Sequence, residues 1–182
     1  MPTPAHPPQL GTLDWTPAAD HPELLAEPVR AALDSLEVDA YVAAIDPDLA
    51  DTAAFCAEYA VPLDVSANCV VVAGRRGETT TMAGCLILAT DRVDVNKTVR
   101  LHLGVRKISF AGMADAVAQT GMAYGGITPV GLPTGWPLLV DHAVAACPWI
   151  LVGSGIRGSK IVLTGADAAR LPGAEVLSLA AG

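Results

Sequence analysis

Apolar residues in this 182-residue chain follow helical spacing near the start and short, strand-length runs afterwards. The first pattern predicts a helix over 22–36, interrupted where Glu27 precedes Pro28, because a residue before proline disfavours the helical region. Residues 40–45 are typical of a strand. Asp46 followed by Pro47 is typical of a helix start, so a second helix is expected to about Tyr59. The chain therefore begins with a helix and a β-α unit.

Short runs of Val, Leu and Ile dominate the rest of the sequence. The runs 69–73 and 79–90 flank the turn 75–78 and predict a β-hairpin. Further strands are expected at 107–110, 138–140, 150–152, 160–163 and 175–179, and helices at 91–103, 113–119 and 166–171. Strands outnumber helices and do not alternate strictly with them. This pattern favours a mixed α/β (α+β) domain over a doubly wound parallel sheet.

The proline-rich stretch 1–21 is expected to be an N-terminal extension or poorly ordered arm, with a single domain over 22–182. The start of the chain lacks a basic region followed by an apolar run, so no signal peptide is expected. Apolar runs stay well below the roughly 20 residues of a membrane span. We expect a cytoplasmic protein with no membrane contact.

Hydrophobic residues make up 52% of the chain and aromatic residues only 4%, so the core must be mainly aliphatic. The net charge of −8 argues against a nucleic-acid partner. Its distribution alters that conclusion, because residues 1–64 hold twelve acids and one base, whereas residues 65–182 hold seven acids and ten bases. The later part could present a basic face to a polyanion, or the charges could be ordinary scatter.

Two glycine-rich loops and one aspartate are the candidate chemical features. Successive backbone N–H groups in Gly125-Gly126-Ile127-Thr128-Pro129 could bind an anion or oxyanion, although a structural turn is the alternative. Asp141 ends an apolar strand and could orient a water or ribose hydroxyl, or cap a local turn. The loop 153–160, with Ser154, Gly155, Arg157 and Lys160, could contact phosphate or form a hairpin turn.

Several chemistries are excluded by spacing. Cys56, Cys69, Cys85 and Cys147 form no C-x-x-C pair, and His142 has no partner at ligand spacing, so no metal and no cofactor are expected. Buried free thiols are the simplest reading of the cysteines. The sequence Gly153-Ser154-Gly155 lacks the outer glycines of a nucleophile elbow.

These segments, taken in order, resemble the YbaK/EbsC family of aminoacyl-tRNA editing domains. The resemblance rests on residues 104–111, Thr120-Gly121, 125–131, Asp141 and 153–158, and it spans roughly residues 65–180. It implies a central, mostly antiparallel, partly barrel-like sheet flanked by helices. It also implies hydrolysis of mischarged aminoacyl-tRNA, with Gly125–Pro129 and Asp141 as the catalytic positions. No DNA partner is expected, and a synthetase is a candidate protein partner.

The family usually has a lysine at the position that Asn68 occupies here. A neutral amide cannot replace a cation, so the sequence leaves two readings open, a deacylase without that lysine and a binding module without turnover. A scaffold role for the acidic first third is a third reading. The resemblance implies that Asn68, Thr120, Gly121, Tyr124, Ser154 and Gly155 bind substrate. Candidates for tRNA contact are Arg92, Lys97, Arg100, Arg106, Lys107, Arg157 and Lys160.

Overall fold

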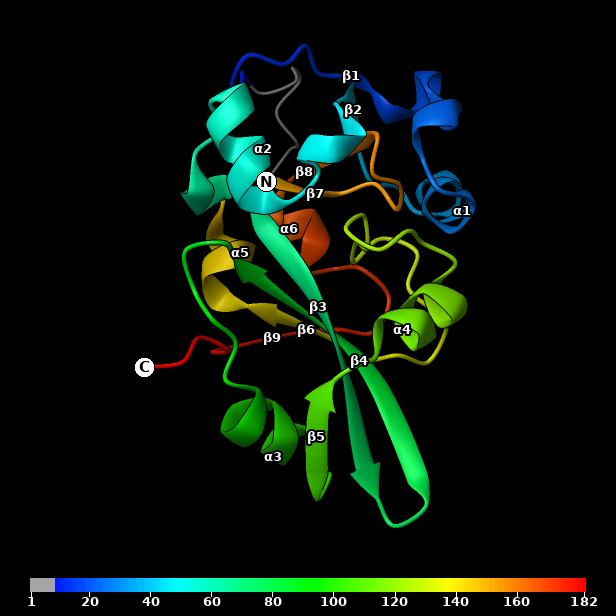
Figure 1. The fold of residues 1–182 in the computed structure, drawn as a ribbon, viewed down its shortest axis with the longest axis vertical. Coiled ribbons are helices and arrows are strands. Elements are labelled where there is room, and N and C mark those ends of the chain that lie inside the picture. Colours follow the sequence, from blue (N-terminus) through cyan, green and yellow to red (C-terminus); the bar gives the residue numbers. More distant parts are fainter. Residues whose placement is uncertain (1–8) are drawn as a thin grey trace.

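Two β-sheets form the body of the protein in the computed structural model, which describes residues 9–182 (Figure 1). The first sheet has the strand order β1-β2-β8-β7, and every neighbouring pair in it is antiparallel. Its strands are β1 (Thr16–Pro17), β2 (Tyr41–Ala44), β7 (Ile150–Gly153) and β8 (Ser159–Leu163).

The second sheet has the order β5-β3-β4-β6-β9 and combines both strand directions. Its strands are β3 (Ala67–Arg76), β4 (Thr79–Leu88), β5 (Lys107–Phe110), β6 (Leu138–Asp141) and β9 (Ala174–Leu177). The β3–β4 hairpin, which the sequence predicts, pairs ten residues in antiparallel register. Gly77 closes its turn at φ +63°, a conformation that favours glycine. The pairs β4–β6 and β6–β9 are parallel.

The two sheets meet at an isolated parallel bridge between Ser66 and Leu151. This bridge brings the start of β3 beside the edge strand β7, and it is the seam on which the candidate site lies. The structure therefore confirms a mixed, mostly antiparallel α/β fold. It shows two open sheets over residues 9–182 rather than one partly barrel-like sheet.

Six α-helices within the described residues connect and cover the strands. They are α1 (Glu27–Ser35), α2 (Thr52–Tyr59), α3 (Arg100–His102), α4 (Met113–Thr120), α5 (His142–Ala146) and α6 (Gly165–Ala168). Four expected helices are shorter than the sequence predicts. The expected 22–36 helix is a 3-10 turn at Pro22–Leu24 followed by α1, and the expected 166–171 helix ends at Ala168. The expected 46–59 helix divides into a 3-10 turn at Pro47–Leu49 and α2. The expected 91–103 helix begins only after Asp94, whose carboxylate accepts from the Lys97 and Thr98 N–H groups and caps a π-helical turn at Val95–Val99.

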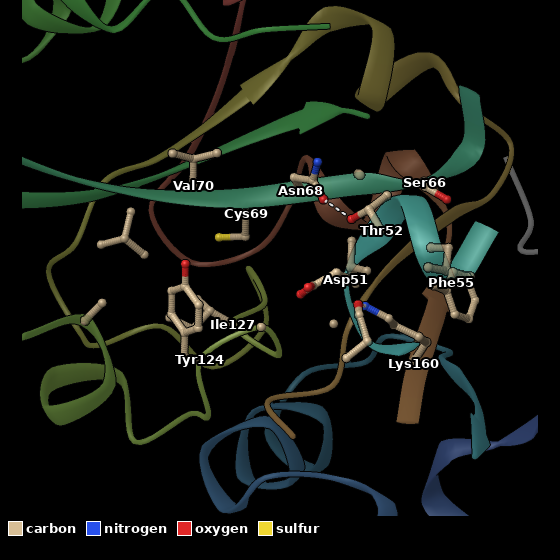
Figure 2. Close-up of a pocket in the computed structure, with 18 of the residues that line it drawn as sticks. Asp51, Thr52, Phe55, Ser66, Asn68, Cys69, Val70, Tyr124, Ile127 and Lys160 are labelled. Atoms are coloured by element: carbon tan, nitrogen blue, oxygen red, sulfur yellow. Dashed lines mark hydrogen bonds between the residues drawn. The ribbon is translucent and has the colours of Figure 1, made fainter. Parts of the chain in front are cut away.

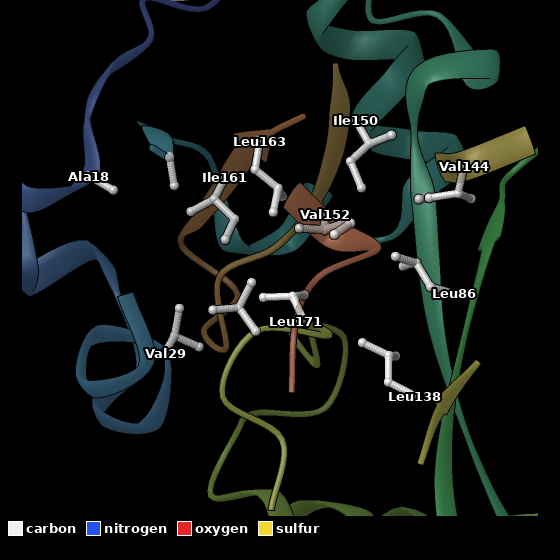
Figure 3. Packing of buried hydrophobic residues seen from close by; sticks show 14 of the residues in the cluster. Ala18, Val29, Leu86, Leu138, Val144, Ile150, Val152, Ile161, Leu163 and Leu171 are labelled. Atoms are coloured by element: carbon white, nitrogen blue, oxygen red, sulfur yellow. The ribbon is translucent and has the colours of Figure 1, made fainter. Parts of the chain in front are cut away.

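The largest core cluster packs both sheets against α1, α5 and α6, and it consists of aliphatic side chains (Figure 3). Val29, Val152, Ile161 and Leu163 are fully or almost fully buried within it. A second cluster places Phe55 of α2 against the first sheet, and a third packs Val99 against the second sheet. The rigid framework around the seam therefore comes from aliphatic packing, as the low aromatic content requires.

Residues 9–21, expected to belong to an N-terminal extension, pack against the first sheet. Trp15 is 6% exposed, and its indole N–H donates to the Leu10 carbonyl at 3.0 Å. Thr16 pairs with Val42 in β2. This part of the extension is therefore not a poorly ordered arm. Residues 1–8 of the same prediction lie outside the described residues.

Candidate functional site

A pocket of about 400 Å³ opens at the seam between the two sheets (Figure 2). Its walls come from segments far apart in sequence: α2, the first half of β3, α4, the 124–127 loop, β7 and β8. Polar side chains gather at one end of the pocket and apolar ones at the other (Figure 2). Such a division suits a ligand with one polar and one apolar part.

The polar end is built by α2, β3 and β8. The Thr52 hydroxyl donates to Asn68 Oδ1 at 2.7 Å, which fixes the amide of Asn68 and leaves its Nδ2 N–H groups for another acceptor. Lys160 Nζ enters from β8 and donates to the Ala50 carbonyl at 2.8 Å. Asp51, exposed at the start of α2, lies beside them (Figure 2).

Lys160 is the most unusual member of this group, because its residue surface is only 6% exposed. Its Nζ lies 5.4 Å from the centre of the Phe55 ring, which favours a cation at that position. Burial lowers the pKa of Lys160 from its ordinary value; Arg157 adds to this effect, while Cys56 and Asp51 oppose it. Lys160 was a candidate for tRNA contact from the sequence, and the structure places it inside the pocket.

Arg157 joins the two sides of the pocket mouth. Its guanidinium donates to the Pro47 carbonyl at 3.2 Å and to the Tyr124 carbonyl at 3.3 Å, and it lies 3.8 Å from Asp51. These contacts tie the segment before α2 to the glycine-rich loop. Arg157 therefore positions the pocket walls, which is a different role from the phosphate contact that the sequence suggested.

The apolar end is lined by Cys69, Ala116 and Ile127. At its rim, Phe110, Met113 and Tyr124 are 64%, 56% and 56% exposed, which is high for large apolar side chains. Burial raises the pKa of the Cys69 thiol well above its ordinary value, and the neighbouring Cys85 adds to this shift. The Cys69 thiol therefore stays protonated and is not an activated nucleophile.

The predicted loop Gly125–Pro129 is only partly at the pocket. Gly125, at φ +83°, and Ile127 line it. The Gly126 N–H donates to the Ala123 carbonyl, so it is not available to a ligand. Thr128 is fully buried and its hydroxyl has no partner within residues 9–182, while Pro129 borders a separate hollow near Trp136. The loop shapes the pocket, but the structure does not present its successive backbone N–H groups to one anion.

Asp141 is not at the pocket. Its Oδ1 accepts from the Ala143 N–H at 2.9 Å and caps α5, and its Oδ2 accepts from the Leu179 and Ala180 N–H groups at 2.7 and 3.3 Å. The side chain is buried and engaged by backbone donors. The geometry favours the capping alternative over the orientation of a water or a ribose hydroxyl.

Four expected substrate contacts also serve the fold instead of lining the pocket. The Thr120 hydroxyl donates to the Ala116 carbonyl, and Gly121 ends α4 in the left-handed region at φ +69°. Ser154 is fully buried, and its hydroxyl lies within hydrogen-bond distance of the carbonyls of Ile156 and Ser159, both at 3.2 Å. Gly155, at φ +86°, packs closely on Ala26 of the segment before α1. Of the expected substrate contacts, Asn68 and Tyr124 line the pocket.

Comparison with known proteins assigns the family. The model of the aminoacyl-tRNA editing domain family matches residues 46–171. This chain belongs to that family. The matched region contains the whole seam and the pocket-lining residues of the editing domain, and it excludes the N-terminal segment that packs through Trp15.

Solved structures share the fold of this editing domain. A proposed trans-editing enzyme for prolyl tRNA synthetase is 22% identical with a TM-score of 0.72, over 86% of this chain and 97% of that one. Hypothetical protein APE2540 is 18% identical with a TM-score of 0.75, over 85% of this chain and 100% of that one. A proposed signal transduction protein from Marinobacter aquaeolei VT8 is 17% identical with a TM-score of 0.55, over 85% of this chain and 30% of that one.

Seven further basic residues of the editing domain lie outside the pocket, in two groups. Arg106 and Lys107 at the start of β5 lie beside Arg75 and Arg76 of β3, since Lys107 pairs with Arg75 and the Arg106 N–H donates to the Arg75 carbonyl. All four are exposed. We call them the hairpin basic cluster.

The second basic group surrounds α3 and consists of Arg92, Lys97 and Arg100. None of these residues lines the pocket. Neither Arg75 nor Arg76 was recognised from the sequence, because both looked like ordinary turn residues. Pairing of β3 with β5 is what brings them beside Arg106 and Lys107.

No group of three His, Cys, Asp or Glu side chains in residues 9–182 is arranged to hold a metal ion. Within the same residues, no helix has the length and apolar character that crossing a bilayer requires.

Proposed function

We propose that this editing domain is a trans-acting deacylase that hydrolyses the ester bond of mischarged aminoacyl-tRNA. The observation that carries the proposal is the divided pocket at the seam, with hydrogen-bond donors at one end and an apolar rim at the other. Membership of the editing family and the fold shared with a proposed trans-editing enzyme support it. Alanyl- and cysteinyl-tRNA(Pro) are the first substrates to test.

The exposed rim gives the tRNA end a place to bind. Phe110, Met113 and Tyr124 present apolar surface at the mouth, and aromatic faces stack on unpaired bases without reading their sequence. The strand β5 leads from Phe110 to Lys107, a distance of about 10 Å at the usual rise per strand residue. The hairpin basic cluster then lies where the phosphates of the acceptor end would follow.

The chemistry relies on water, since the pocket offers no activated nucleophile. Cys69 is held as a thiol by burial, and Ser66 is engaged with Cys56 and the Pro62 carbonyl. A water molecule would attack the ester carbonyl, the bond to the ribose oxygen would break, and that oxygen would take a proton from the water. The products are a free amino acid and uncharged tRNA. The Asn68 amide is a donor for the bound ester.

The groups found at the pocket also favour a second function, which is binding without turnover. Asn68 is neutral and Asp141 is engaged elsewhere, so the expected catalytic groups are fewer at the pocket than the resemblance implies. In this second reading the pocket binds an aminoacyl or nucleotide group without turnover.

The deciding experiment measures deacylation of a panel of aminoacyl-tRNAs by the wild-type protein, Asn68→Ala and Asn68→Lys. Leu101→Ala is the matched control, because Leu101 is an exposed apolar residue on α3 outside the pocket. The deacylase proposal expects turnover by the wild type and by the control, with a loss of about ten-fold in Asn68→Ala. Hydrolysis that appears only in Asn68→Lys would support the binding function and contradict the deacylase.

A further inference from the structure

Lys160 is a buried cation for which the described part of the fold supplies only one hydrogen-bond acceptor. Its Nζ donates to the Ala50 carbonyl, and no carboxylate within residues 9–182 approaches it to ion-pair distance. An ammonium has three N–H donors. Burying such a group without an anion destabilises a protein, so a buried lysine with no carboxylate partner among the described residues points to an anionic ligand group.

The side chain is held in place by its surroundings. Lys160 belongs to β8 and pairs with Gly153 of β7, and both residues line the pocket. Its stem packs beside Phe55, with Nζ 5.4 Å from the ring centre. Figure 2 shows Nζ at the polar end of the pocket, on the side of Asp51 and facing the space below Asn68.

The same geometry brings Lys160 close to the glycine-rich loop. Its strand partner Gly153 touches the loop backbone so closely that an added Cβ would lie 2.5 Å from the Gly126 carbonyl oxygen and 3.1 Å from that of Ile127. Lys160 and the Gly125–Ile127 backbone therefore form adjacent walls of one pocket. An ester bound against that loop would have its carbonyl within reach of an ammonium on β8.

We propose that the Lys160 ammonium is a catalytic residue that donates a hydrogen bond to the carbonyl oxygen of the scissile aminoacyl ester. This inference rests on the proposed deacylase function. Water adds to the carbonyl carbon, and the carbonyl oxygen gains negative charge, which the ammonium stabilises without giving up its proton. The bond to the ribose oxygen then breaks, and that oxygen takes a proton from the attacking water. The amino acid leaves as a carboxylate, with the second proton released to solvent.

The role requires the charged form of Lys160. Burial and Arg157 lower its pKa, whereas Asp51 and Cys56 favour the cation, and the carbonyl of Ala50 accepts from it. The lysine-dependent part of the rate should therefore be present below the lowered pKa and disappear as the pH rises through it. Hydroxide-driven hydrolysis without protein rises over the same range, so this fall is separable from it.

The test compares wild type, Lys160→Met and Lys160→Ala, with Arg30→Met as the control for loss of one positive charge outside the pocket. Single-turnover deacylation is measured on whichever tRNA the wild type hydrolyses. Lys160→Met should lose about ten- to a hundred-fold in the rate constant at saturating protein with little change in the half-saturating protein concentration, since the oxygen gains its charge only in the transition state. Ethylamine should restore part of the rate to Lys160→Ala, which a structural lysine would not show.

A second probe separates this inference from the proposed function. Adenosine carrying a 3′-linked aminoalkylphosphonate mimics the charged intermediate and requires no turnover. Lys160→Met should bind it about ten-fold or more weakly than wild type and Arg30→Met do, while binding of unmodified adenosine stays the same. Equal phosphonate affinity, or an equal rate constant in a folded Lys160→Met protein, overturns the inference. An inactive wild type that binds the phosphonate through Lys160 overturns the deacylase but keeps the oxyanion contact.

Discussion

Substitution of Gly126 by alanine tests whether close backbone contact holds the pocket wall. A Cβ on Gly126 would lie 2.7 Å from the carbonyl oxygen, 2.8 Å from the carbonyl carbon and 2.9 Å from the nitrogen of Ile156. These are backbone atoms and cannot rotate away as a side chain can. The loop and the β7–β8 turn must therefore separate, which also disturbs the 2.7 Å hydrogen bond from the Gly155 N–H to the Gly126 carbonyl.

The expected cost of Gly126→Ala adds two contributions. Overpacking costs about 1–3 kcal/mol, and a weakened hydrogen bond about 0.5–1.5 kcal/mol, so the free energy of unfolding should fall by about 2–4 kcal/mol. Urea unfolding followed by circular dichroism measures this, with a midpoint lower by about 1–2 M.

Gly158→Ala is the matched control for Gly126→Ala. Gly158 lies in the neighbouring β7–β8 turn, but an added Cβ would meet only Pro47, at 3.9 Å. Alanine there should be neutral or stabilise by up to about 1 kcal/mol. Equal midpoints for the two variants would refute the argument that the Gly126–Ile156 contact is rigid.

Three further predictions follow from burial and charge. Trp15→Ala should lower the free energy of unfolding by about 3–5 kcal/mol in urea titrations, because Trp15 is 6% exposed; a change below about 1 kcal/mol would mean that residues 9–21 do not stabilise the domain. Burial raises the pKa of Cys85 to about 12, so iodoacetamide at pH 8 should modify it far more slowly than Cys147 by mass spectrometry, and equal rates would contradict this. The pKa of Lys160 is lowered in the folded protein. Between that pKa and about 10.4 the unfolded chain therefore binds more protons at this group than the folded protein does, so the contribution of Lys160 to the free energy of unfolding rises with pH. Lys160→Met should remove that gain, and an unchanged pH slope would contradict the assignment.

Local sequence rules predicted the strands better than the helix boundaries. The β3–β4 hairpin is readable because ten paired residues flank a turn with a glycine at the required conformation. The helix starts depend on capping contacts that the spacing of apolar residues does not show. One example is the Asp94 carboxylate, which accepts from the backbone N–H groups of Lys97 and Thr98. Helix α5 was missed because its apolar sequence continues directly from β6.

The glycine-rich and acidic positions that stand out in the sequence mostly build the frame of the site. Asp141 binds three backbone N–H groups, Ser154 fills a buried turn, and Gly126 permits close approach of two loops. Each is distinctive because its backbone surroundings allow few alternatives, and the same constraint explains why it stands out without touching a ligand.

The side chains that face the pocket come from positions with no local signature. Thr52 begins a helix and Lys160 follows a turn into an apolar strand, 108 positions later in the chain. Only the seam between β3 and β7 brings both to one end of the pocket with Asn68. A lysine directly before three consecutive aliphatic residues of a strand was the one available signal, since lysine is rarely buried in a sheet without a partner. Removal of the buried ammonium therefore tests catalysis more directly than a change in the glycine-rich loop does. Loss of Lys160 should lower the deacylation rate, whereas a change in the loop should mainly lower the stability of the fold.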